Sequence, residues 1–67
     1  MENRTLIFTT ESEQLADMIQ SKLEAENIDT LKINHRDTVS HAFGVVELYV
    51  LNENAEKAKE IIAASND

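Results

Sequence analysis

Strand-like and helix-like segments follow one another in a fixed order along this chain of 67 residues, and that order limits the folds open to it. The segments 4–10, 29–34 and 45–51 are rich in β-branched and aromatic residues or alternate between apolar and polar residues, which predicts strands. The stretches that begin at Thr10 and at Asn52 carry apolar residues three and four positions apart, which predicts amphipathic helices. The expected order is strand, helix, strand, strand, helix.

This order predicts an α+β fold with two layers. Each amphipathic helix must bury its apolar stripe against the sheet, so we expect both helices on one face. A right-handed crossover makes the first two strands parallel, and the third strand fits between them, antiparallel to both. The result is a ferredoxin-like βαββα sandwich with a three-stranded antiparallel sheet. The length allows one domain, residues 1–67.

The boundaries of the first helix are predicted by its capping residues. Thr10 and Glu13 have the spacing of a capping box, so Thr10 is expected to open the helix. Asn27 tolerates the left-handed turn that ends a helix, so the helix should stop near Glu26 or Asn27. The inner stripes of the two helices are expected to consist of Leu15, Met18, Ile19 and Leu23, and of Ala55, Ala58, Ile61 and Ile62.

Alternation along the strands predicts which side chains face the helices. On this pattern the inward residues are Leu6 and Phe8, Leu31 and Ile33, and Val46, Leu48 and Val50. The outer face of the sheet would then present Ile7, Thr9, Val45, Tyr49 and Leu51, together with Glu47, Thr30 and Lys32. Large exposed apolar patches are often interaction sites, so Ile7, Val45, Tyr49 and Leu51 are candidate interface residues. Two alternatives remain open: a second copy of the chain covers this face, giving a homodimer, or the loop 35–44 folds over it through Phe43.

Composition excludes several classes of function. The net charge of −7 and the six scattered Lys and Arg residues argue against binding nucleic acid or an anionic membrane. The chain has no cysteine and one glycine, so disulfides, thiolate metal sites and glycine-rich phosphate loops are not expected. There is no apolar run of membrane-spanning length and no signal-peptide pattern at the N-terminus, which favours a cytoplasmic protein.

One stretch of the chain is locally basic. Lys32, His35, Arg36 and His41 could bind a small anionic ligand or an acidic segment of a partner, although ordinary loop polarity is the better explanation of these residues. The two histidines lack the spacing of a known metal site, so no metal or other cofactor is expected. Ser40, His41 and Asp37 are too close in sequence to form a hydrolytic triad by themselves, and we expect no enzymatic activity.

Several segments together resemble a known family. Thr9-Thr-Glu-Ser-Glu-Gln-Leu-Ala16, Leu23-Glu-Ala-Glu-Asn-Ile28 and Leu48-Tyr-Val-Leu51 with Ala55 and Ala58 are similar to a small bacterial family labelled putative prokaryotic signal-transducing proteins. The label implies likeness to PII-type regulatory sensors. The resemblance implies the fold and favours a regulatory, non-enzymatic role, in which the chain binds a protein partner or a second copy through the outer face of its sheet or through the loop 35–44. A sensor of an anionic metabolite is the alternative. It carries over no catalytic or ligand residue, and Asn27 stands where glycine is common in the family.

Overall fold

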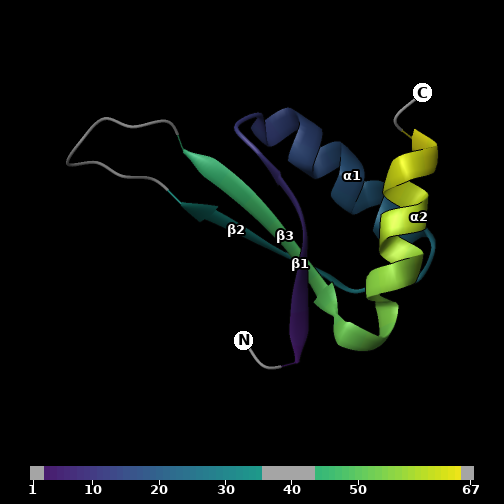
Figure 1. Cartoon of the computed structure of the whole chain (residues 1–67). Helices are drawn as coiled ribbons and strands as arrows, with labels where there is room; N and C mark the ends of the chain where they lie inside the picture. The colour runs from purple at the N-terminus through teal and green to yellow at the C-terminus, as the bar shows by residue number, and fades with distance from the viewer. Residues whose placement is uncertain (1–2, 36–43, 66–67) are drawn as a thin grey trace.

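The computed structural model describes residues 3–35 and 44–65, and it shows the predicted order of elements. These elements are β1 (Arg4–Thr10), α1 (Glu13–Ala25), β2 (Thr30–His35), β3 (Val45–Leu51), the short 3₁₀ helix η1 (Asn52–Asn54) and α2 (Ala55–Ser65). The strand order is β1-β3-β2, and β3 is antiparallel to both neighbours. Both helices lie on one side of this sheet (Figure 1). The predicted α+β, ferredoxin-like βαββα arrangement is confirmed.

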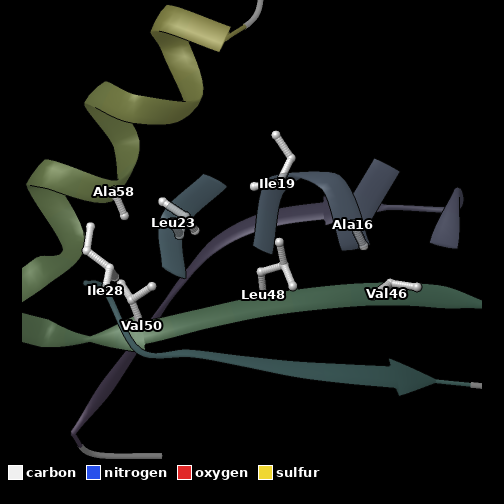
Figure 2. Close-up of a cluster of buried hydrophobic side chains, with 8 residues drawn as sticks. All are labelled: Ala16, Ile19, Leu23, Ile28, Val46, Leu48, Val50 and Ala58. Atoms are coloured by element: carbon white, nitrogen blue, oxygen red, sulfur yellow. The ribbon is translucent and has the colours of Figure 1, made fainter. Parts of the chain in front are cut away.

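The core lies between β3 and the two helices, as Figure 2 shows. Along β3 every second residue is buried, as the alternation predicted. Burying one such aliphatic side chain stabilises the fold by about 1.5–3 kcal/mol. The buried apolar residues are Ala16, Ile19, Leu23, Ile28, Val46, Leu48, Val50 and Ala58.

The start of α1 differs from the prediction. Ser12 is the N-cap, and its Oγ accepts a hydrogen bond from the backbone N–H of Leu15 at 3.1 Å. Thr10 remains in β1, opposite Val46, and its Oγ1 accepts from the N–H of Ser12. The pairing with β3 keeps Thr10 extended, so the helix can begin only two residues later.

The end of α1 follows the prediction. Asn27 has a positive φ of 66°, the left-handed conformation that Asn adopts more readily than most residues. The N–H of Asn27 donates to the carbonyl of Glu24, and the N–H of Ile28 donates to the carbonyl of Leu23. These two bonds form a Schellman motif, which satisfies the last carbonyls of the helix.

The inner stripe of α1 is turned relative to the predicted one. Ala16 is fully buried, whereas Leu15 and Met18 are 36% and 48% exposed. The predicted inward positions of Leu15 and Met18 were therefore wrong, because the small side chain of Ala16 occupies the position closest to the core. On α2, Ala58 is buried, and Ala55, Ile61 and Ile62 pack against the core as predicted.

Candidate functional site on the outer face of the sheet

The side chains of β2 point the opposite way from the prediction. Lys32 lies directly opposite Leu48, and Asn34 lies opposite Val46, two buried core residues of β3. Residues directly opposite in an antiparallel pair share one face of the sheet. Thr30, Lys32 and Asn34 therefore face the helices, and Leu31 and Ile33 face away from them.

Polar contacts between α1 and β2 accompany this orientation. Lys32 Nζ forms an ion pair with Asp17 Oδ1, and Asn34 Nδ2 donates to Glu13 Oε2 at 3.2 Å. Gln20 Nε2 donates to the carbonyl of Thr30 at 3.1 Å. Because β2 is an edge strand, its long polar side chains can extend past the core and reach the helix. Glu13 and Asp17 have helical spacing and share one side of α1, but this spacing does not by itself indicate contacts with β2.

A bulge in β1 changes the face of one predicted interface residue. Leu6 pairs with Tyr49 and Phe8 pairs with Leu48, so two steps along β1 match one step along β3. Ile7 is the extra residue, and it packs against the core together with Phe8. Leu6 instead lies on the outer face and is 42% exposed. The outer-face placement of Ile7 was wrong, because a bulge interrupts the simple alternation on which it rested.

The corrected outer face is more apolar than the sequence predicted, because Leu6, Leu31 and Ile33 join it while Thr30 and Lys32 leave it. Leu6, Tyr49 and Leu31 form one apolar row that crosses all three strands. The outer placement of Val45, Tyr49 and Leu51 is as predicted, and their role as an interface stays a prediction. We call this surface the outer sheet face; its apolar residues are Leu6, Leu31, Ile33, Val45, Tyr49 and Leu51.

Polar groups on the outer sheet face are paired with one another. The hydroxyl of Tyr49 donates to Glu47 Oε1 at 2.9 Å, two residues back on the same strand. This hydrogen bond, assisted by desolvation and by the charge of Glu47, raises the pKa of Tyr49 above its usual 10.0. The phenol serves as a hydrogen-bond donor to Glu47.

An ion pair crosses the outer sheet face at the Leu51 end. Arg4 lies opposite Leu51 on β1, and its Nη2 is 3.0 Å from Oδ2 of Asp29, the residue before β2. The pair therefore links the two edges of the sheet across β3. The other terminal nitrogen of Arg4, Nη1, is buried and has no acceptor within the described part of the chain.

Within its described part, the fold does not bring the predicted basic ligand residues together. Lys32 lies on the helix side of the sheet, and its hydrogen bond to Asp17 raises its pKa above 10.5. His35 ends β2 opposite Val45, while Arg36 and His41 lie outside the described residues. Within residues 3–35 and 44–65, no group of three His, Asp or Glu side chains is placed to hold a metal ion.

Comparison with known proteins identifies the family. The model of the family described as "putative prokaryotic signal transducing protein" matches residues 5–66. The chain belongs to this family. The match spans β1 to α2 and so covers every element that forms the outer sheet face. No curated protein matches the chain, and no solved structure matches it. No helix in the described ranges is long and apolar enough to cross a membrane.

Proposed function

We propose that this family member is a non-enzymatic signal-transducing domain of the cytoplasm that binds a protein through its outer sheet face. The observation that carries the proposal is the row Leu6–Tyr49–Leu31, which crosses the sheet on the side away from both helices. The protein bound there is either a partner or a second copy of the chain. Apolar surface of this kind gains free energy when another protein removes it from water.

The distribution of polar contacts supports a binding role more than a catalytic one. The acidic residues Glu13 and Asp17, which have helical spacing, contact Asn34 and Lys32. These contacts link α1 to β2, so both carboxylates already have partners within the fold. On the outer sheet face, Tyr49 and Glu47 bind each other. The titratable groups in these pairs therefore have structural partners.

The second candidate function is a PII-like sensor of a small anionic metabolite. Lys32 carries a positive charge at neutral pH, which favours binding of an anion. Asp17 already neutralises that charge, however, and the ion pair faces the helix layer. A ligand would have to compete with Asp17 or bind through the residues 35–41. We therefore favour protein binding over metabolite sensing.

A differential capture experiment tests the proposal. The immobilised parent is compared with Tyr49→Glu, which places a charge on the outer sheet face. The control is Met18→Glu, which makes the same kind of change at an exposed position of α1. We expect proteins retained by the parent and by Met18→Glu to be lost from Tyr49→Glu. Equal retention by all three would contradict binding through this face. A metabolite that raises the melting temperature of the parent but not of Lys32→Met would favour the sensor instead.

A further inference from the structure

We propose that the occupant of the outer sheet face is a second copy of this chain, so that two sheets stack face to face in a two-fold homodimer. The inference rests on the proposed function and names the partner. In an isologous dimer the same patch serves both subunits, so it must be complementary to itself. Three features of the outer sheet face bear on this requirement: its charge, its area and the pairing of the Tyr49 hydroxyl.

Charge is the first argument. The chain carries a net charge of −7, so two copies repel each other over most of their surface. The charged side chains placed on or beside the outer sheet face are Arg4, Asp29 and Glu47, which together contribute one negative charge. The other described acids lie on the helices and the turns that flank them. Two copies can therefore meet at this face without bringing most of their negative charge together, whereas a strongly charged partner would find little to pair with.

The area of the face is the second consideration, and it predicts the strength of the dimer. Two twisted sheets stack well at about −30°, with the sheets about 10 Å apart. Three strands of about seven residues give a footprint of roughly 340 Å² per copy, from a strand spacing of about 4.8 Å and a rise of about 3.4 Å. This flat footprint is below the roughly 800 Å² of accessible surface that each partner buries in a standard interface, although the uneven surface of the side chains adds to the buried area. The dimer should therefore be weak and depend on concentration.

The pairing of polar groups is the third argument. Burying a polar group without a hydrogen-bond partner destabilises an interface. The Tyr49 hydroxyl already donates to Glu47, and Arg4 already pairs with Asp29. An apolar patch from a second copy can therefore cover the Tyr49 hydroxyl without having to supply an acceptor, whereas the Arg4–Asp29 pair, in which Arg4 Nη1 has no acceptor within the described residues, lies at the Leu51 end of the face. Tyr49 lies in the central strand, where an aromatic residue contributes most to an interface.

Sedimentation of the purified chain from low to high micromolar concentration tests the inference. We expect the parent to shift from monomer to dimer over this range. Tyr49→Glu should weaken the dimer by at least about tenfold, because it replaces the central aromatic residue with a charge. Leu6→Glu provides a second variant at an exposed position, and Met18→Glu on α1 is the control that should dimerise like the parent. Circular dichroism verifies that each variant is folded.

Two results would overturn the homodimer. One is a parent that remains monomeric at high micromolar concentration, and the other is a dimer that survives both Tyr49→Glu and Leu6→Glu. If Tyr49→Glu does not fold, the homodimer is tested by Leu6→Glu alone, and a dimer that survives this substitution overturns it. A monomeric parent whose captured proteins are still lost from Tyr49→Glu would reject the homodimer and leave the proposed function standing. A parent that dimerises through the face without retaining any other protein would support the homodimer as the main interaction.

Discussion

Leu6 lies directly opposite Tyr49 on the outer sheet face, 42% exposed, while the next residue along β1, Ile7, packs against the core. This relationship depends on the bulge, which places two residues of β1 against one step of β3. Without the bulge, Ile7 would take the place beside Tyr49, and Leu6 would point toward the helices. The bulge therefore decides which side chain completes the apolar row of the outer sheet face.

Matched substitutions at these neighbouring positions test the bulge. Ile7→Ser should lower the free energy of unfolding by about 1–3 kcal/mol, because it removes apolar contacts with the core. Leu6→Ser should change it by less than about 0.5 kcal/mol in dilute, monomeric protein, because the side chain is exposed there. Urea denaturation measures both values. The reverse order would show that the regular alternation is correct and that the bulge is absent.

Leu23 and Leu48 are fully buried, and each should be essential for folding. Replacing either with Ala should lower the free energy of unfolding by about 2–5 kcal/mol through lost burial and a cavity. A domain of this size has only about 3–5 kcal/mol of stability, so both variants should be largely unfolded by circular dichroism. Met18→Ala on the exposed side of α1 is the control and should melt close to the parent. A Leu48→Ala variant that melts within a few degrees of the parent would refute the core assignment.

The N-cap of α1 can be tested with two serines of the same region. Ser12→Ala removes the acceptor for the N–H of Leu15 and should destabilise the fold by about 1 kcal/mol. Ser21→Ala, at an exposed position within α1, should be neutral or slightly stabilising, because Ala favours helix. Thermal denaturation distinguishes the two. Thr10→Ala would have the largest effect of the three if the helix began at Thr10 instead.

Tyr49 can be titrated directly, because it is the only tyrosine and the chain has no tryptophan. Its raised pKa predicts that the midpoint of the rise in tyrosinate absorbance lies above pH 10.0, with the hydrogen bond to Glu47 as the main cause. Glu47→Thr should lower the midpoint toward the ordinary value. Since the folded pKa is above the unfolded one, the associated stabilisation is present below pH 10.0 and is lost as pH rises through the folded pKa. An unchanged midpoint in Glu47→Thr would show that the hydrogen bond is absent in solution.

Local patterns were sufficient to predict much of the fold. The alternation of Val46, Leu48 and Val50 predicted the buried face of β3, because β3 is the central strand, with a neighbouring strand on each side. Asn27 predicted the end of α1, because its left-handed conformation involves only adjacent residues. The crossover rule predicted the strand order. The apolar character of an outer sheet face was also predicted, although half of its apolar residues were assigned incorrectly.

The sequence by itself thus determined the elements, their order, the central strand and the last turn of α1, since all of these depend on local propensity, spacing and chain connectivity. Only the tertiary structure decided which faces of β1 and β2 turn toward the helices. A strand with period two has two faces, and a shift of one residue exchanges them. In β2 the register with β3 places Lys32 and Asn34 on the helix side, where they contact α1, and in β1 the bulge at Ile7 exchanges the faces. Both are pairings between distant segments, which no local pattern encodes.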